Sequence, residues 1–407
     1  MAFLVVLQDL HREDKMIKTK QVHALPESQL KSIGWEWLIG QDTLPYVTNE
    51  MVVVSEKEVQ KYYEATNELY EMFVKAGQYA IDKKLLDKLG IPKNLQDLVK
   101  YTWEDDAHQW HLYGRFDLAG GIDGKPIKLI EFNANTATCI PETAVVQSAQ
   151  LVANGFDEAL QFNSLFEALV ENFNRLRDKN PQLDASLLIS GMEGFPEDDA
   201  NLAVIAEAAK EAGFFVTIES IDKVEFSKEE GIFRFDAERN HYENYNYWFT
   251  LIPWEYIAWD EPELAQTLTQ IVVQNKAIVI NPAYTLLFQS KYILKILWDL
   301  FPNHPLLLAT SEQPLANKKQ VEKVFFGREG ANVRVIGETG NTQTWRGGEY
   351  EKQAKIYQEF VDFPKDLAGN NYQAGVFFAF EACGLGFRRG SEILDNQAQF
   401  CGHLVEN

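Results

Sequence analysis

The chain has 407 residues, with 60 acidic against 38 basic side chains, and its formal net charge is −22. Binding to a nucleic-acid backbone or an anionic membrane needs a strongly basic face, because contacts to phosphate supply most of the non-specific affinity. The charge balance therefore argues against those partners and favours a neutral or cationic small molecule. A hydrophobic content of 46% is enough for a sizeable core, and the length predicts two or three domains or one large domain.

The three cysteines, Cys139, Cys383 and Cys401, are too few for a disulfide framework, and no two of them have CxxC spacing. We therefore expect a reducing, cytoplasmic compartment. The apolar run Phe3–Leu7 has no basic segment before it and is ended by Asp9, so we expect a first strand there, not a signal peptide or a membrane span.

Helical and strand-like patterns alternate along the chain, which predicts a mixed α/β fold. Residues 55–80 begin with Ser55 and Glu58 in capping-box spacing and continue with apolar residues at helical spacing, so they predict a long amphipathic helix. Residues 110–116 and 128–132 have strand patterns, and the glycine-rich segment 119–126 between them predicts a β-hairpin.

Further elements are expected along the rest of the chain. Residues 140–176 are expected to be largely helical, and strands at 186–190 and 214–219 around a helix at 198–212, with a buried strand at 277–281, predict a βαβ layer. In the C-terminal third, short strands at 323–326, 332–336, 355–361 and 373–382 are separated by glycine, asparagine and charged turns, which predicts an antiparallel sheet.

The densest group of polar residues lies on the predicted hairpin. Alternate residues of a strand share a face, so Arg115 and Asp117 point the same way, as do Glu131, Asn133 and Asn135. If the two strands pair, one surface carries a cation, two carboxylates and two amides. Such oxygen ligands suit Mg²⁺, which also binds waters and substrate phosphates. A solvated polar face of an antiparallel sheet is the alternative that this pattern leaves open.

A second group surrounds the segment Gly327–Gly330. Lys323 precedes it on a predicted strand, and Arg328 lies within it, so backbone amides and two basic groups are placed where a phosphate chain could bind. A plain β-turn that needs glycine is the alternative. The chain contains no Walker A sequence and no GxGxxG that opens a helix after a strand, so any nucleotide site is built differently.

Other basic and nucleophilic residues are less informative. Lys291 lies in a helical stretch, where a lysine is most often on the surface, and Arg388 and Arg389 follow a strand, where they bind phosphate or are solvated. The histidines show no HExxH pattern and no nucleophile elbow, so histidine-based nucleophilic catalysis is poorly supported.

The chain resembles the synthetase domain of glutathionylspermidine synthetase and its relatives over roughly residues 35–405. The motifs that carry the resemblance are, in chain order, GRFD at 114–117, EFNANTATCIPE at 131–142, NPAYTLLFQSKYILKILWDLFPNHPLLL at 281–308, KVFFGREGANV at 323–333, YQEFVDFP at 357–364, and GLGFRRG at 384–390 with Phe400 and His403. No amidase domain of the kind fused to some bifunctional relatives is recognised, so hydrolysis of the product is not expected.

The resemblance implies an ATP-grasp fold and three regions. These are a mostly helical N-terminal segment at 1–112, a pre-ATP-grasp and metal/substrate-binding α/β region at 113–290, and an ATP-grasp nucleotide-binding region at 291–407. It also implies an ADP-forming ligase: ATP activates a carboxylate as an acyl phosphate, and an amine then attacks it to give an amide. The implied substrates are ATP, a small or short-peptide acid, and a cationic amine.

The resemblance assigns roles residue by residue. Asp117, Glu131 and Asn133 would bind two Mg²⁺ ions, and Arg115 would stabilise the negative charge of the acyl phosphate and contact ATP. Lys291 and Lys323 would bind the ATP phosphates, and the turn Gly327–Gly330 would close over them. The backbone of Gln358, Glu359, Phe360 and Val361 would bind adenine, with Arg388 as a C-terminal active-site arginine, and Thr136, Thr138, Asp198, Asp199 and Thr250 would contact the substrates.

Departures from the family pattern concern the acceptor. Val324 and Ala200 stand where relatives usually have Pro and Arg, and Arg389-Gly390 stands where an acidic pair is typical. A lost carboxylate weakens the case for spermidine, since fold and ATP chemistry do not fix the acceptor. Two other functions stay open: a nucleotide-binding regulator or scaffold of this fold without ligase turnover, and a phosphotransferase with a stable phosphorylated product.

Overall fold

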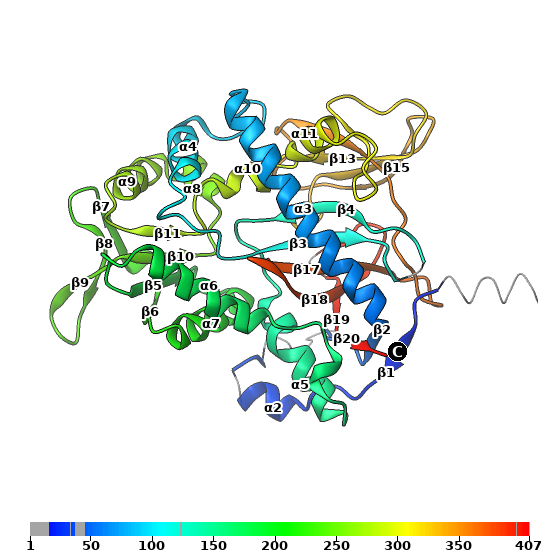
Figure 1. Ribbon diagram of the computed structural model, residues 1–407, viewed down its shortest axis with the longest axis horizontal. Helices are drawn as coiled ribbons and strands as arrows, with labels where there is room; N and C mark the ends of the chain where they lie inside the picture. The colour runs from blue at the N-terminus through cyan, green and yellow to red at the C-terminus, as the bar shows by residue number, and fades with distance from the viewer. Residues whose placement is uncertain (1–15, 33, 37–44, 123, 396, 407) are drawn as a thin grey trace, which may run out of the picture.

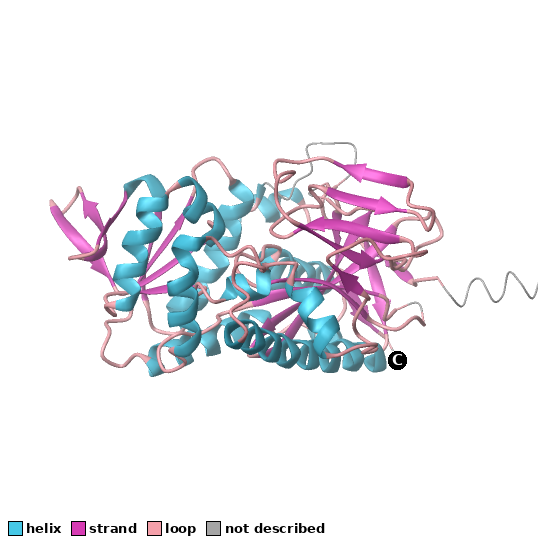
Figure 2. Cartoon of the chain, turned by 90° about the horizontal axis from the view of Figure 1, so that it is seen from above, coloured by secondary structure: helices cyan, strands magenta, loops and turns pink. Residues whose placement is uncertain are grey.

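The computed structural model describes residues 16–32, 34–36, 45–122, 124–395 and 397–406 (Figure 1). The strand predicted at Phe3–Leu7 lies outside these residues. The mixed α/β fold predicted from the sequence is confirmed: the described residues form five sheets with helices packed on them. Figure 2 shows a region rich in strands at one end of the molecule and helix-flanked strands toward the other.

The predicted long helix is confirmed as α3 (Glu56–Asp82). Its capping box is complete, because the Glu58 N–H donates to Ser55 Oγ (3.3 Å) while Glu58 Oε2 accepts from the Ser55 N–H (2.8 Å). The buried face of α3 lies across the central sheet (Figure 1), where Phe73 meets the rings of Phe116 and Phe132 edge-on at 5.6 and 5.1 Å. The helix therefore supports the strands that carry the predicted metal ligands.

The central sheet is antiparallel and has the order β19-β18-β17-β3-β4, with β3 (Gly114–Ala119), β4 (Lys128–Asn133), β17 (Asn371–Ala379), β18 (Glu381–Gly390) and β19 (Gln399–Cys401). The predicted hairpin is confirmed, although its first strand begins at Gly114 because the Leu112 N–H is bound by Asn281 Oδ1 (2.8 Å). The strand predicted at 373–382 is wrong in its end: Phe380 has a φ of 72°, and the chain reverses there into β18.

A second antiparallel sheet confirms the prediction for the C-terminal third. Its order is β12-β16-β13-β14-β15, with β12 (Thr310–Ser311), β13 (Gln320–Val324), β14 (Val333–Ile336), β15 (Thr342–Arg346) and β16 (Lys355–Glu359). Lys323 lies inside β13, paired with Ile356, and does not open the strand as predicted. Residues 325 and 326 follow the strand.

The parallel sheet has the order β11-β10-β5-β6, with β5 (Ser186–Gly191), β6 (Phe215–Ser220), β10 (Tyr247–Thr250) and β11 (Ile278–Ile280). The helix α7 (Pro196–Glu211) connects β5 to β6 as the predicted βαβ layer requires, whereas the sequence reasoning missed β10, which lies between β5 and β11. An antiparallel three-stranded sheet follows β6: β7 (Val224–Ser227), β8 (Gly231–Asp236) and β9 (His241–Tyr245).

Residues 140–176 are helical in pieces and not as one helix. They form a π-helical turn η3 (Glu142–Val146), α5 (Gln147–Ala153), the short turn η4 (Glu158–Leu160) and the start of α6 (Leu165–Lys179). Gly155 has a φ of 83°, a left-handed conformation that ends α5 and favours glycine. The remaining helices are α2 (Glu27–Ser32), η2 (Lys93–Leu95), α4 (Gln96–Glu104), η5 (Ile221–Lys223), α8 (Trp254–Asp260), α9 (Pro262–Val273), α10 (Thr285–Gln289) and α11 (Ile293–Leu300).

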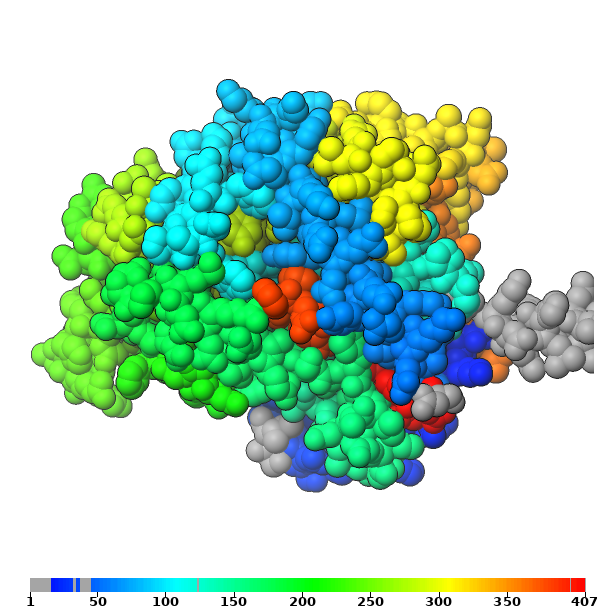
Figure 3. All heavy atoms as spheres, viewed as in Figure 1, coloured from blue at the N-terminus to red at the C-terminus, as the bar shows by residue number. Residues whose placement is uncertain are grey.

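Described segments near both ends of the chain form a small sheet of order β1-β2-β20, with β1 (Thr19–Gln21), β2 (Glu50–Val54) and β20 (His403–Val405). Sheets thus combine segments from all three predicted regions, and the boundaries at 112 and 290 stay a prediction. Figure 3 shows described residues from the blue and the red parts of the colour range side by side on one face of the molecule, as the pairing of β2 with β20 requires. Over the described part of the chain, every helix is too short or too polar to cross a bilayer.

Candidate active site

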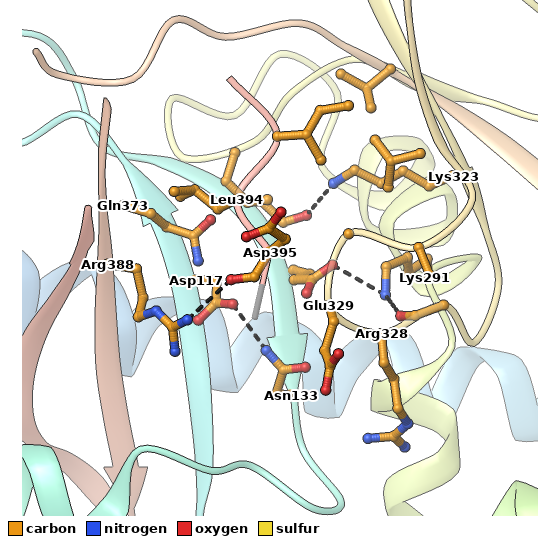
Figure 4. A pocket seen from close by; sticks show the side chains of 18 of the residues that line it. Asp117, Asn133, Lys291, Lys323, Arg328, Glu329, Gln373, Arg388, Leu394 and Asp395 are labelled. Carbon is orange, nitrogen blue, oxygen red and sulfur yellow. Dashed lines mark hydrogen bonds and ion pairs between the residues drawn. The ribbon is translucent and has the colours of Figure 1, made fainter. Parts of the chain in front are cut away.

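A cavity of about 280 Å³ lies between the central sheet and the sheet of β12 to β16 (Figure 4). Its walls come from β3, β4, β13, β14 and the end of β16, from the segment 327–331, and from residues 392–395. Most of the residues predicted to act on ATP, metal or substrate line this one cavity: Arg115, Asp117, Glu131, Asn133, Thr136, Thr138, Lys291, Lys323, Gln358, Glu359, Phe360, Val361 and Arg388.

Arg115 and Asp117 share a face of β3, as the strand period predicts. Nε and Nη2 of Arg115 donate to the two carboxylate oxygens of Asp117, at 2.8 and 3.2 Å, and Nη1 donates to the Thr138 carbonyl at 2.7 Å. Asn133, opposite Arg115 in the hairpin, donates Nδ2 to Asp117 Oδ2 at 3.1 Å. Burial alone would lower the pKa of Arg115. The Asp117 carboxylate outweighs this effect and the pKa is raised, so the guanidinium is a fixed cation.

Glu131 lies between two buried lysines. Lys291 Nζ is 3.1 Å from Glu131 Oε2 and donates to the Gly327 carbonyl at 2.7 Å, while Lys323 Nζ donates to Gln358 Oε1 at 2.8 Å. Burial favours the neutral acid, yet Lys291 and Lys323 lower the pKa of Glu131. Burial, together with Lys291, lowers the pKa of Lys323 to about 8.

The expectation that Lys291 is a helical surface lysine is wrong. The residue lies between α10 and α11, only 6% of it is exposed, and its backbone N–H donates to the Phe325 carbonyl (2.9 Å). That hydrogen bond ties the end of α10 to the chain just after β13 and points the ammonium group into the cavity, as Figure 4 shows.

The segment Gly327–Gly330 is a tight loop above the lysines. Gly330 has a φ of 68°, and a Cβ there would lie 2.8 Å from the Leu394 carbonyl oxygen, so only glycine fits. Arg328 reaches across the cavity wall: Nη1 donates to Thr136 Oγ1 (2.8 Å) and Nη2 to Glu255 Oε1 (2.7 Å). Lys323, Arg328 and this loop line the same cavity, and phosphate binding by them stays a prediction.

The end of β16 gives the cavity an apolar wall. Phe360 and Val361 follow Glu359 and lie near Leu308 and Val321 in the lining. The Glu359 N–H donates to the Ala309 carbonyl (2.7 Å), which holds this segment against β12. An apolar wall of this kind suits a flat aromatic base, and adenine binding by residues 358–361 stays a prediction.

Arg388 and Arg389 point to opposite faces of β18. Arg388 lines the cavity, where Nη1 donates to Cys139 Sγ (3.3 Å) and Nη2 to the Asp395 carbonyl (3.1 Å). Arg389 instead pairs with Glu50 (3.3 Å) and Asp366 (3.8 Å) outside the cavity. The unusual residue Arg389 therefore does not change the charge of the cavity wall.

Several predicted residues lie elsewhere. Asp198, Asp199 and Thr250 are not among the residues that line the cavity; Thr250 is buried and its Oγ1 accepts from the Ile252 N–H (3.1 Å). Asn135 does not share the face of Glu131 because β4 ends at Asn133, and its amide donates to Thr285 Oγ1 (3.1 Å). The sequence reasoning missed the lining residues Glu392 and Asp395 altogether and named Glu197 and Glu329 without an individual role.

The donor set fits a hard cation. Asp117, Glu131 and Asn133 present carboxylate and amide oxygens on adjacent strands, which are Mg²⁺ ligands, and none offers nitrogen or sulfur in competition. Among the described residues, no three side chains of His, Cys, Asp or Glu gather to hold a metal ion. The three predicted residues would therefore hold Mg²⁺ only together with water and phosphate oxygens, as is usual for this ion.

The fold is of the glutathione synthetase-like, ATP-grasp type. The solved structure of a glutathione synthetase-like effector from Globodera pallida matches 94% of this chain and 98% of its own, with a TM-score of 0.55 and 8% identity, a likeness of fold alone. The family model described as glutathionylspermidine synthase preATP-grasp matches residues 17–406. The chain belongs to this family, as its motifs predict.

Three relatives of this chain have names that describe a ligase or a synthetase. A Haemophilus influenzae protein that carries the provisional name acid–amine ligase is 28% identical over 359 residues, which cover 85% of this chain and 87% of its own. The bifunctional glutathionylspermidine synthetase/amidase of Escherichia coli is 25% identical, over 88% of this chain and 58% of its own. The trypanothione synthetase of Crithidia fasciculata is 23% identical, over 83% of this chain and 55% of its own. The chain thus spans little more than half of the latter two relatives.

Proposed function

We propose that this protein is an ATP-dependent acid–amine ligase that forms an amide through an acyl phosphate and releases ADP. The observation that carries the proposal is one cavity in which two carboxylates and an amide of the β3–β4 hairpin lie among buried and half-buried cations. These cations are Arg115, Lys291, Lys323, Arg328 and Arg388. Membership in a family whose relatives are named as ligases supports the same conclusion.

In the first step, a carboxylate oxygen of the acid attacks the terminal phosphorus of ATP. An O–P bond forms, the bond between the β- and γ-phosphates breaks, and ADP leaves. Lys291 and Lys323 have their ammonium groups fixed in the cavity, so they would offset phosphate charge without rearranging. Mg²⁺ held by Asp117, Glu131 and Asn133 would add positive charge at the phosphates.

In the second step, the nitrogen of the neutral amine attacks the acyl carbon. A C–N bond forms, the C–O bond to phosphate breaks, and the nitrogen gives a proton to the released phosphate. Negative charge develops on the acyl oxygen, and the guanidinium of Arg115, pinned by Asp117, would stabilise it without reorganisation. Arg388 adds a second cation on the same wall.

The substrates follow from the charge of the cavity. Its cationic part suits ATP and the carboxylate of a small or short-peptide acid, while Glu197 and Glu329 on the lining, with Asp198 nearby, suit a cationic amine. We therefore propose a charged amine as the acceptor. The likeness to glutathione- and spermidine-using relatives makes these compounds the first candidates to test.

The experiment crosses a panel of short peptides and other acids with a panel of amines in Mg-ATP, and follows ADP release and product mass. A ligase releases ADP only when both substrates are present and gives a product of mass acid plus amine minus water. Nucleotide binding without acceptor-dependent turnover across the panel would favour a regulator. A stable phosphorylated acid formed without amine would favour a phosphotransferase.

A further inference from the structure

Three side chains of the short helix α8 contact the loop above the cavity or residues beside it. Glu255 pairs with Arg328, the Tyr256 hydroxyl contacts the Tyr350 hydroxyl, and the Trp259 ring meets Phe326 edge-on at 6.0 Å. These contacts join the region of the parallel sheet to the segment that follows β13. The position of the loop Gly327–Gly330 therefore depends on α8 as well as on its own sheet.

Glu255 is the most buried charged partner in this contact. Its side chain is 0% exposed, and Oε1 accepts from Arg328 Nη2 at 2.7 Å. Among the described residues, Glu255 Oε2 and Arg328 Nε are buried without a hydrogen-bond partner. The pair thus has one further acceptor, Glu255 Oε2, and one further donor, Arg328 Nε. A small rotation would join them and make the pair bidentate, the geometry that a guanidinium and a carboxylate favour.

Opening of the loop would leave the Glu255 carboxylate buried without its cation. A buried charge that loses its partner is strongly destabilising, so the pair biases the loop toward the cavity. Thr136 completes the placement, because its Oγ1 accepts from the other terminal nitrogen of Arg328 at 2.8 Å. Figure 4 shows the Arg328 side chain extending away from Lys323, so its direction is set by these two partners and not by the lysine pair.

We infer that Glu255 is a positioning residue that holds the loop Gly327–Gly330 over the cavity through Arg328, with Thr136 fixing the direction of the guanidinium. Its kinetic consequence rests on the proposed ligase function, whereas its structural consequence does not. Glu255 itself does not line the cavity. It acts on the reaction only through the loop, whose Gly327 carbonyl also accepts from Lys291.

The first test is amide hydrogen exchange measured by mass spectrometry on peptides that cover residues 327–331. The Ala331 N–H, which donates to the Arg328 carbonyl (2.8 Å), reports loop closure. We expect Glu255→Gln to raise exchange of this segment by about tenfold, as a lost closing contact should. The matched control is Glu322→Gln, which removes a buried carboxylate paired with Lys355 (3.1 Å) outside the cavity lining and should leave the segment unchanged.

A double-mutant cycle guards against a general loss of stability. If Glu255 and Arg328 act through each other, exchange in the double variant Glu255→Gln/Arg328→Gln is no faster than in Arg328→Gln alone. Additive effects, or wild-type exchange in Glu255→Gln, would overturn the inference. Neither reading needs turnover, so this failure is separate from a failure of the proposed function, which the substrate panel reports.

The kinetic test uses the substrate pair that the panel identifies. Glu255→Gln should lower kcat by about tenfold and leave the KM of the amine near its wild-type value, because the loop covers the phosphate end. Glu255→Asp keeps the charge and should recover part of the loss. An unchanged kcat in Glu255→Gln, with exchange raised, would mean that the loop position does not serve catalysis.

Discussion

Two parts of the cavity lining differ in burial and in charge. In the first part, Lys291 and Lys323 are each 6% exposed, and carbonyl, amide and carboxylate oxygens hold their ammonium groups. In the second part, the side chains of Glu197, in the first turn of α7, and Glu329 are exposed. Partial burial of its carboxyl group, and secondly the nearby Glu142 carboxylate, raise the pKa of Glu197 to about 7. The lysines thus belong to a buried cationic frame, and Glu197 and Glu329 form an exposed rim of carboxyl groups.

This difference separates what the reaction needs from what the substrate needs. Charge that develops on phosphate and acyl oxygens is best met by fixed groups that do not reorganise, and the buried frame provides them. A cationic amine must enter the cavity before it reacts. The exposed carboxylates of the rim attract its positive charge without binding it tightly. Variants of the frame should therefore act on kcat, and variants of the rim on KM.

The largest effect is expected from Glu131, which faces both lysines. Glu131→Gln removes the carboxylate that pairs with Lys291 and one of the two acidic metal ligands, so turnover should fall below detection, by more than about a thousandfold. Steady-state ADP release measures the loss, and thermal unfolding checks the fold. Asp117→Asn should lower turnover to the same extent. Wild-type turnover in either folded variant would contradict the metal assignment.

Substitution of Arg115 should give the second largest loss of turnover. Arg115→Ala removes the guanidinium that Asp117 holds, and losing one preorganised donor of this kind costs about 2.7–4 kcal/mol, or roughly a hundred- to a thousandfold in kcat. Arg115→Lys keeps the charge but cannot bind both oxygens of Asp117, so it should recover only part. Full recovery by lysine would show that charge alone matters at this position.

The frame could be predicted from the sequence because its geometry is local. The period of two places Arg115 and Asp117 on one face, and the hairpin brings Glu131 and Asn133 opposite them. The same reasoning failed for Asn135, because a strand end cannot be read from the alternation of residues. Lys323 entered the prediction through the glycine-containing segment that follows it, whereas only the resemblance of the motifs brought Lys291 into the site.

The rim, and the contact of Glu255 with Arg328 in the loop, could not be predicted in the same way. Glu255 lies 73 residues before Arg328, and its significance comes from burial beside that arginine, which no spacing in the sequence reveals. The resemblance implies substrate contacts for Asp198 and Asp199, whereas in the structure it is their neighbour Glu197 that lines the cavity. Tertiary packing, and not propensity, decides such contacts.

The rim predicts a moderate effect that depends on pH. Because the pKa of Glu197 is raised to about 7, its carboxyl is mostly neutral below that pH and charged above it. The KM of a cationic amine should fall as pH rises through about 7. Glu197→Gln should raise the KM about five- to tenfold at pH 8 and remove this dependence, with little change in kcat. A neutral acceptor analogue is the control, and an equal effect of Glu197→Gln on it would contradict the charge argument.

The smallest effect concerns Lys323 and tests whether the frame holds its charge. Burial lowers the pKa of Lys323 to about 8, so the ammonium group is charged below that pH and loses its proton as pH rises through it. The Kd of Mg-ADP, measured by titration calorimetry, should therefore increase about three- to tenfold between pH 7 and pH 9.5. Lys323→Arg keeps a guanidinium that stays protonated over this range, so its Kd should stay nearly constant even if its affinity at pH 7 is lower. If the Kd of the arginine variant rises as steeply as that of the wild type, another group causes the pH dependence and Lys323 is not the titrating cation of the nucleotide end.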